Sequence, residues 1–327
     1  MRGLYLESGT LTLRQDLPEP RQRPGWSRVQ VLQAGICATD QALAKGYMGF
    51  TGVPGHEFVG RALDGPLQGK RVVGEINAGC GECAVCRAGD SRHCPERTVL
   101  GIVDHPGAFA ERLALPDRNL LAVPDAVADD AATFVEPLAA ALHIGADVDL
   151  ARHRRALVAG DGKLGILCAW ALHLGGCEVT VAGRHRERQG LLPPDTRLQT
   201  DWLEPGSAPA AAAAAFDLAV DATGNPQVLP RLLSMVRPRG TIVLKTTTER
   251  PTEADLSLLV VHELRLLGSR CGAFAPALEV LAQGKVPVDR LVAARFPLHD
   301  GPAAFARAAQ KGTLKVLVQI EAAGGAQ

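Results

Sequence analysis

Four cysteines lie within fifteen residues, in the spacing C-x2-C-x2-C-x7-C. A structural zinc takes four ligands in a tetrahedron, and gaps of two residues let a turning backbone present successive thiolates to one centre. Glycines beside the cysteines permit the tight turns. Since cysteine fills every position, none stays open for a substrate, and the cluster predicts a structural zinc site. Iron–sulfur ligation and unliganded core cysteines are the alternatives. The predicted ligands are Cys80, Cys83, Cys86 and Cys94.

Further zinc-ligand types lie outside this cluster. Cys37 occurs in GICATD, His56 and Glu57 occur in PGHE, and Glu136 occurs in VEPLA. Taken alone, Cys37 fits a small core residue and His56 fits a hydrogen-bonded core histidine. These residues therefore gain meaning only from the context in which they occur.

A glycine pattern of the form G-x-G-x-x-G is formed by Gly160, Gly162 and Gly165. It lies between an apolar run and a helix pattern with an apolar face, which is the context a dinucleotide-binding turn requires. The glycines let a pyrophosphate approach the helix N-terminus, at Lys163 and Leu164. A simple glycine-rich turn is the alternative.

The end of the next predicted strand bears on the choice of dinucleotide. NAD enzymes usually place Asp or Glu there to bind the ribose hydroxyls, but this chain has Gly183, followed by Arg184 and Arg188. With no carboxylate to repel a 2′-phosphate and with Arg184 to pair with it, the sequence favours NADP over NAD. A solvated basic helix start that still accepts NAD is the alternative.

The elements that must position these residues differ along the chain. About 135 N-terminal residues form short alternating runs typical of strands, and from about Glu136 strands alternate with helices, which predicts a parallel sheet with crossover helices. The alanine-rich stretch 208–215 is interpreted as a degenerate helix or a loop. Strands are predicted at 28–33, 58–63, 70–73, 156–159, 178–182, 218–221, 241–245 and 265–268, and helices at 138–147, 163–174 and 274–283, the last followed by short strands.

Taken in order, the motifs resemble the zinc-dependent medium-chain dehydrogenase/reductase family, the alcohol and polyol dehydrogenase group. The resemblance covers nearly the whole chain and rests on GICATD, GHE, the four cysteines, EPLA, the glycine turn and DATG. It implies an α/β fold with a GroES-like β-barrel catalytic domain at 1–140 and 272–327. A Rossmann doubly wound parallel-sheet domain is implied at 141–271, with the active site in the cleft between the two.

The resemblance also assigns roles to residues. Cys37 and His56 are expected to bind a catalytic zinc, with Glu57 and Glu136 at the remaining carboxylate positions, which gives two zincs per chain. Thr39 is placed to pass on the hydroxyl proton, and the alternative is a threonine that caps a helix. Asp40 is expected to accept a hydrogen bond from the His56 ring. Thr223 and Arg270 are expected beside the cofactor, and Ala42 stands where the family often has a histidine.

The implied activity is hydride transfer between an alcohol or polyol, or its carbonyl form, and NADP(H). An open zinc position would bind the substrate oxygen and stabilise the alkoxide. The alternatives are a zinc-free reductase and a non-catalytic dinucleotide-binding protein on the same scaffold. Residues 45–50 are expected to line the substrate pocket, and they do not identify the substrate.

Composition limits the classes of partner. Lys plus Arg and Asp plus Glu each number 35, so net charge gives no support for binding nucleic acid or a membrane surface. No run of 18 apolar residues predicts a membrane span, and the N-terminal residues lack the apolar centre of a signal peptide. We therefore expect a cytoplasmic protein that binds a small-molecule substrate and, as is common in the family, forms a homodimer or homotetramer.

Overall fold

The computed structural model describes residues 1–203, 213–248 and 250–320. The chain forms two compact units, one made of Met1–Glu136 with Ala273–Gln327 and the other of Pro137–Gly272. The first unit is built mainly on a mixed sheet and the second on a parallel sheet. The predicted fold class, α/β, is confirmed by the mixed sheet of one unit and the parallel sheet of the other.

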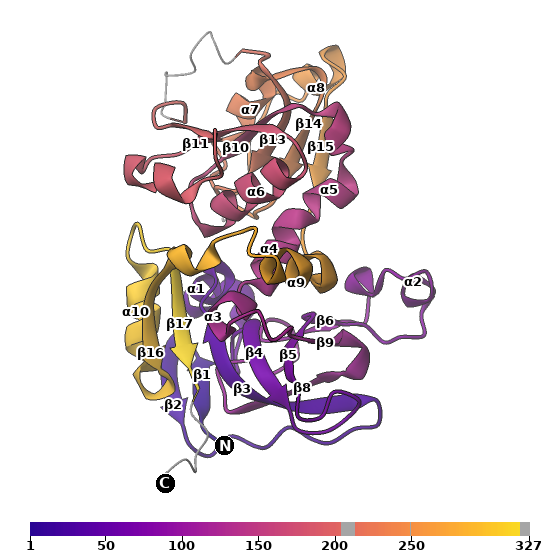
Figure 1. Cartoon of the computed structure of the whole chain (residues 1–327), viewed down its shortest axis with the longest axis vertical. Coiled ribbons are helices and arrows are strands. Elements are labelled where there is room, and N and C mark those ends of the chain that lie inside the picture. Colours follow the sequence, from indigo (N-terminus) through magenta and orange to yellow (C-terminus); the bar gives the residue numbers. More distant parts are fainter. Residues whose placement is uncertain (204–212, 249, 321–327) are drawn as a thin grey trace. The chain divides into compact units, whose positions relative to one another are not determined.

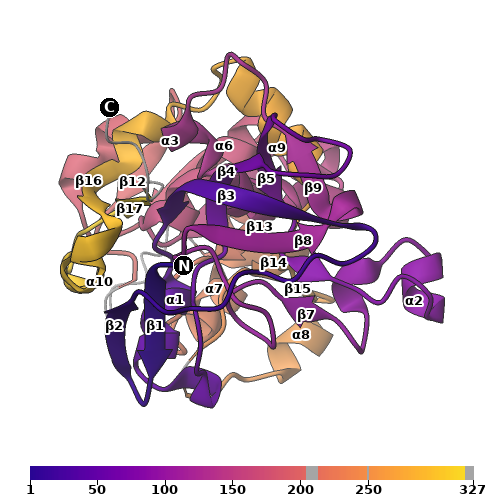
Figure 2. The ribbon, with the colours of Figure 1, turned by 90° about the horizontal axis from the view of Figure 1, so that it is seen from below.

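The first unit is organised around β3 (Trp26–Gly35), whose residues alternate between buried and half-buried positions as one-sided packing requires. β3 pairs antiparallel with β4, β8 and β17, and β16 pairs parallel with β17. Figure 2 shows β3 and β8 side by side. The other strands of this sheet are β4 (Glu57–Ala62), β5 (Arg71–Gly74), β8 (Arg112–Pro116), β9 (Leu120–Ala122), β16 (Val292–Pro297) and β17 (Lys315–Gln319).

Two small antiparallel pairs and several helices complete this unit. The pairs are β1 (Gly3–Glu7) with β2 (Thr10–Arg14) and β6 (Asn77–Ala78) with β7 (Thr98–Val99). The helices are α1 (Ala38–Ala44), α2 (Ala84–Arg87), α3 (Asp129–Ala132), α9 (Phe274–Ala282) and α10 (Gly301–Ala309); α4 (Val135–Leu142) begins at the boundary with the second unit.

The second unit holds a six-stranded sheet, parallel throughout, in the order β12-β11-β10-β13-β14-β15. Leu157 and Ala159 of β10 pack in one apolar cluster with Leu232 and Leu233 of α7, and α6 also packs on the sheet (Figure 1). The elements are α5 (Ile144–Asp147), β10 (Arg155–Ala159), α6 (Lys163–Leu174), β11 (Glu178–Ala182), β12 (Arg197–Gln199), β13 (Phe216–Asp221), α7 (Leu229–Met235), β14 (Val236–Leu244), α8 (Ser257–Val261) and β15 (Arg265–Gly268).

Two sequence predictions need correction. The helix expected over 138–147 is divided between α4 and α5 around His143. The C-terminal part holds a second helix, α10, where only strands were expected after α9. Of the alanine-rich stretch 208–215, residues 208–212 lie outside the described residues, and residues 213–215 form a turn before β13.

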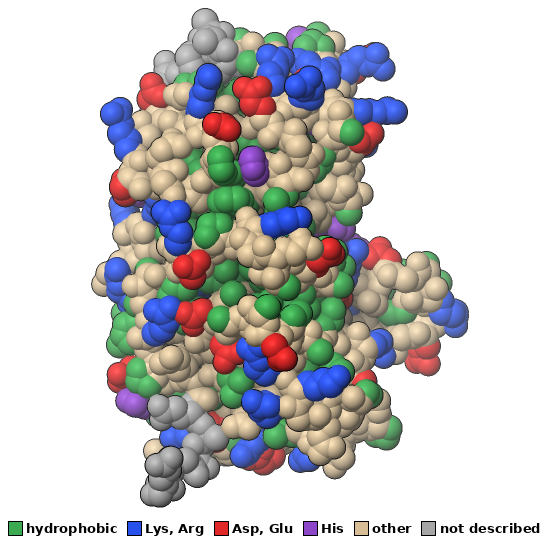
Figure 3. All heavy atoms as spheres, viewed as in Figure 1, with side chains coloured by type: hydrophobic (Ala, Val, Ile, Leu, Met, Phe, Trp, Pro, Cys, Tyr) green, Lys and Arg blue, Asp and Glu red, His purple; other side chains and the backbone are tan. Residues whose placement is uncertain are grey.

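Charges of both signs are present on the face drawn in Figure 3, in keeping with the balanced composition. Within the described part of the chain, every helix is too short or too polar to cross a membrane.

Candidate metal and cofactor sites

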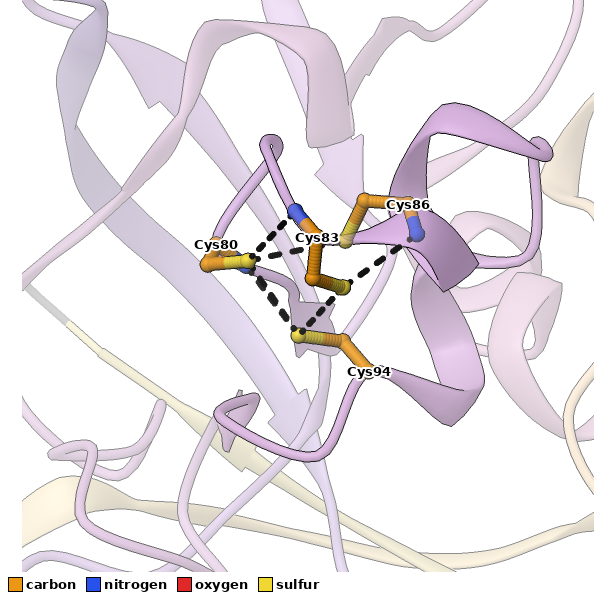
Figure 4. A group of neighbouring side chains, drawn as sticks. All are labelled: Cys80, Cys83, Cys86 and Cys94. Atoms are coloured by element: carbon orange, nitrogen blue, oxygen red, sulfur yellow. Dashed lines mark hydrogen bonds between the residues drawn. The ribbon is translucent and has the colours of Figure 1, made fainter.

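The four clustered cysteines converge on one point (Figure 4). The Sγ atom of Cys94 lies 3.6 Å from that of Cys80 and 3.8 Å from that of Cys83, and the Sγ atoms of Cys80 and Cys86 are 4.0 Å apart. A tetrahedron with zinc–sulfur bonds of about 2.3 Å has edges of about 3.8 Å. The sulfur positions therefore fit a tetrahedral zinc ion without rearrangement.

Backbone geometry holds these sulfurs in place. The N–H groups of Cys83 and Cys86 each donate to the sulfur three residues earlier at 3.4 Å, and Cys83 is the N-cap of α2. The N–H of Cys80 donates to Cys94 Sγ and lowers the pKa of that thiol to about 7. A Cβ on Gly79 would lie 3.0 Å from Cys86 Sγ, so a larger residue there would crowd the sulfurs.

Cys94→Ser is expected to remove one zinc per chain and to open residues 80–94, here called the cysteine lobe, to proteolysis. The reason is that this lobe has little apolar core and would depend on the metal for its fold. Limited proteolysis with mass mapping of the fragments checks this. Cys271→Ser, which changes a cysteine outside both clusters, is the matched control and should behave as wild type. Equal resistance of the Cys94 variant and wild type would contradict a metal-dependent lobe.

A second group joins Cys37, His56 and Glu57, whose ligand atoms all lie within 4.8 Å of one another. Cys37 follows β3 as the N-cap of α1, and Glu57 begins β4. Antiparallel pairing places Gly35 opposite Glu57, so the sheet itself brings the two segments together. His56 and Glu57 are buried and Cys37 is half-buried. Sulfur, nitrogen and carboxylate donors around one point fit a catalytic zinc.

Asp40 stands behind this group and is fully buried. Its Oδ2 accepts a hydrogen bond from the Cys37 N–H at 2.8 Å, and its Oδ1 accepts one from the Gly55 N–H at 3.1 Å. Oδ1 also lies 3.4 Å from Nδ1 of His56, a buried atom that has no hydrogen-bond partner. The carboxylate thus faces Nδ1 and leaves Nε2 as the ring nitrogen available to a metal.

The electrostatics around His56 are dominated by negative charge. Burial lowers the pKa of the imidazole, but Asp40 and Cys37 outweigh that effect and place it well above its ordinary value. The same charges would favour a divalent cation.

Thr39 lies inside the first turn of α1, because that helix begins at Ala38 with Cys37 as its N-cap. Its alternative interpretation, a helix-capping threonine, is wrong. The Cys37 Sγ lies 3.9 Å from Thr39 Oγ1.

Lys315 is a site residue that sequence reasoning missed. Its Nζ donates to Oε2 of Glu57, and both side chains are only 1% exposed. Burial lowers the pKa of the ammonium group, but Glu57, Cys37 and Glu136 raise it above its ordinary value, so Lys315 is charged. Nζ also lies 5.3 Å from the centre of the Phe134 ring. A single lysine in the apolar strand β17 was the available signal.

Glu136 is half-buried and close enough to Lys315 to raise its pKa. It does not join the compact ligand group, which within the described residues consists of Cys37, His56 and Glu57. The geometry therefore favours Glu57 over Glu136 as the carboxylate ligand of a metal.

The glycine turn has the geometry that the sequence predicts. Gly160 has φ +106°, and its N–H donates to the Ala182 carbonyl at 2.7 Å. A Cβ on Gly165 would lie 1.9 Å from the Gly160 oxygen, so only glycine fits there. Gly162 is the N-cap of α6, and Lys163 and Leu164 are the first two residues of that helix.

The premise that no carboxylate lies at the end of β11 is wrong. Asp161, from the turn itself, reaches this strand end, where its Oδ2 accepts the N–H groups of Arg184 at 2.9 Å and His185 at 2.7 Å. A Cβ on Gly183 would lie 2.5 Å from the same oxygen. The absence of Asp or Glu at Gly183 in the sequence therefore does not mean absence of a carboxylate in space.

The remaining predicted cofactor residues lie in varied surroundings. Arg188 is buried, and its Nη1 donates to the Asp161 carbonyl at 2.7 Å, whereas Arg184 is exposed. Thr223 donates from Oγ1 to Asp221 at 2.6 Å in the turn after β13. Arg270 is exposed, and its carbonyl accepts from Lys245.

Known proteins match this chain over most of its length. Residues 23–125 match the family model of the alcohol dehydrogenase GroES-like domain, and residues 130–320 match that of the glucose dehydrogenase C-terminus. The chain belongs to the zinc-type medium-chain alcohol and polyol dehydrogenase family. The predicted enzyme class, an alcohol-dehydrogenase-like oxidoreductase dependent on NAD(P), is confirmed.

Three of the similar proteins match nearly the whole chain. The starvation-sensing protein RspB of Escherichia coli K12 is 28% identical over 90% of this chain and 92% of its own length. An L-threonine 3-dehydrogenase of Streptomyces avermitilis is 27% identical, with 93% and 94% covered. The structure of the alcohol dehydrogenase RspB from Escherichia coli CFT073 with NADH has a TM-score of 0.85 and 25% identity, with 98% and 99% covered.

Proposed function

We propose that this dehydrogenase interconverts a small alcohol and its carbonyl compound, with a nicotinamide dinucleotide as hydride acceptor or donor. One zinc per chain would be held by Cys37, His56 and Glu57, and a second by the four-cysteine lobe. The observation that carries the proposal is the compact, largely buried group of three different ligand types, which has Asp40 behind its histidine.

The residues around the proposed catalytic zinc group have distinct tasks. Zinc in this position supplies a Lewis acid that lowers the pKa of a bound hydroxyl. Asp40 orients the His56 ring, and Lys315 fixes one carboxylate oxygen of Glu57. Thr39, in the first turn of α1, would relay the hydroxyl proton: its Oγ1 would accept that proton while its own proton passes to a water molecule. Glu136, close to Lys315, adds negative charge beside the group.

The dinucleotide would bind at the glycine turn. The N–H groups at the start of α6, at Lys163 and Leu164, point their positive end toward a pyrophosphate. Thr223 and Arg270 lie in loops that follow β13 and β15, at the carboxyl ends where ligands of parallel sheets bind. This placement supports their assignment to the cofactor site.

The substrate screen should begin with hydroxyl compounds that carry polar neighbours. A relative that matches almost the whole chain is named L-threonine 3-dehydrogenase, so L-threonine, related amino alcohols, polyols and simple alcohols form the first panel.

Native mass spectrometry of the freshly purified protein tests the proposal. We expect two zincs per chain, one zinc in Cys37→Ala, and the other zinc alone in Cys94→Ser, with nucleotide retained or bound on addition. One zinc in wild type that disappears only in the lobe variant would contradict the catalytic metal. It would favour a metal-free reductase or a binding protein.

We also propose that the enzyme is a homo-oligomer that associates through its second unit. β15 ends the six-stranded sheet in the described part of the chain, and Val260 and Val261 on neighbouring α8 are 79% and 72% exposed. An edge strand beside apolar side chains suits pairing with a second copy.

Val261→Asp is expected to shift the oligomer toward monomer, because burying the new carboxylate in the interface is costly. Size-exclusion chromatography with light scattering measures the change. Leu174→Asp, at a 37% exposed position at the end of α6, is the matched control and should keep the wild-type mass. A wild-type monomer would contradict the proposal.

A further inference from the structure

We propose that Asp161, between the first two glycines of the phosphate-binding turn, sets the cofactor preference and makes the enzyme select NAD(H) over NADP(H). The inference rests on the proposed function, since it concerns the nucleotide used in that reaction. It replaces the preference that the sequence alone suggested.

The turn brings Asp161 to the end of the neighbouring strand. β10 and β11 are parallel partners with Ala159 opposite Ala182, so the residues that follow each strand emerge side by side. The N–H of Gly160 donates to the Ala182 carbonyl and closes the turn against β11. As a result, the Asp161 side chain occupies the space where a side chain on Gly183 would have to lie.

The carboxylate also occupies the donors that an added phosphate would need. The N–H groups of Arg184 and His185 donate to Oδ2 of Asp161, and Nδ1 of the His185 ring lies 3.0 Å from the same oxygen. A 2′-phosphate at this strand end would therefore meet a carboxylate instead of vacant backbone donors.

The charge of Asp161 also favours NAD(H) over NADP(H). Burial raises the pKa of Asp161, but the N–H groups of Arg184 and His185, the His185 ring and Arg188 outweigh it and lower the pKa below its ordinary value, so the group is ionised. Arg188 is buried against Asp161, with Nη1 3.4 Å from Oδ1. Its charge is thus compensated within the protein.

A ribose hydroxyl suits this carboxylate, and a phosphate does not. Both backbone N–H groups donate to Oδ2, whereas the contacts of Oδ1 with His185 Nδ1 at 3.1 Å and Arg188 Nη1 at 3.4 Å are longer, so Oδ1 is the oxygen that would accept a 2′-hydroxyl donor. A dianionic 2′-phosphate in the same place would be repelled by Asp161, and the buried Arg188 that could balance its charge is already paired with that carboxylate. Asp161 thus acts in place of the acidic residue that NAD enzymes carry at the end of this strand.

Equilibrium binding of NADH and NADPH to the purified enzyme, followed by nucleotide fluorescence, tests the inference without turnover. We expect wild type to bind NADH at least about tenfold more tightly than NADPH, and Asp161→Asn to narrow that ratio about tenfold, mainly by tighter NADPH binding. Glu187→Gln, an exposed carboxylate in the same basic segment, is the control and should leave the ratio unchanged.

A transposed variant separates the role of the carboxylate from that of the turn. Asp161→Gly combined with Gly183→Asp moves the acid to the strand end itself, and we expect it to restore the preference for NADH that Asp161→Gly alone weakens. Tighter NADPH binding by wild type, or an unchanged ratio in Asp161→Asn, would overturn the inference and leave the proposed function standing. Failure of wild type to bind either nucleotide would instead contradict the proposed function.

Discussion

Cys37→Ala is expected to reduce turnover by about a thousandfold or more while the protein remains folded, since loss of Lewis-acid stabilisation costs several kcal/mol and each 1.4 kcal/mol is about tenfold in rate. The change removes the only sulfur donor of the catalytic group. Asp40 caps α1 through the backbone N–H of Cys37, and alanine keeps that N–H.

Steady-state turnover on the best substrate of the panel measures the loss, and circular dichroism with a urea titration checks the fold. Cys271→Ser serves as the control for loss of a thiol elsewhere and should retain wild-type turnover. Alcohol oxidation at the wild-type rate in Cys37→Ala would rule out the proposed role of the metal.

The second large effect concerns the buried ion pair. Lys315→Met is expected to lower the free energy of unfolding of the chelator-treated protein by about 3–5 kcal/mol, because Glu57 without zinc beside it would remain as an uncompensated buried charge. Methionine preserves much of the side-chain volume beside Phe134, so the loss reports mainly on charge. Urea unfolding, with and without prior chelator treatment, provides the measurement.

Two variants separate this effect from general damage. Lys311→Met removes an exposed lysine near the same strand and should change stability by less than about 0.5 kcal/mol. Adding Glu57→Gln to Lys315→Met removes both charges and should recover part of the lost stability. Wild-type stability in Lys315→Met would show that the pair does not hold the two segments together.

Local patterns made much of the second unit predictable. The bounds of α6, β11 and β15 agree with the sequence prediction, because apolar periodicity and flanking glycines determine such elements within a short window. The convergence of the four cysteines and the tightness of the glycine turn could be predicted for the same reason, since both depend on residues close in the chain.

Features that depend on distant segments were not predicted. Lys315 pairs with Glu57, from which it is separated by 258 positions in the sequence, and neither local motif predicts this pairing. Asp161 was overlooked because its role depends on how the turn folds back against Gly183. The helix α10 did carry a signal, Pro302 in its first turn, but the alanine-rich sequence gave little amphipathic contrast.

The return of the chain to complete its first sheet has a consequence for biosynthesis. At about 5–20 residues per second, a ribosome needs roughly 13–50 s to add the 258 residues between Glu57 and Lys315. During that interval β3 lacks its partner β17, and its open edge is available to other nascent chains. We therefore expect the newly made protein to depend on chaperones until the last strands emerge, and translation stalled in this region to yield aggregating fragments.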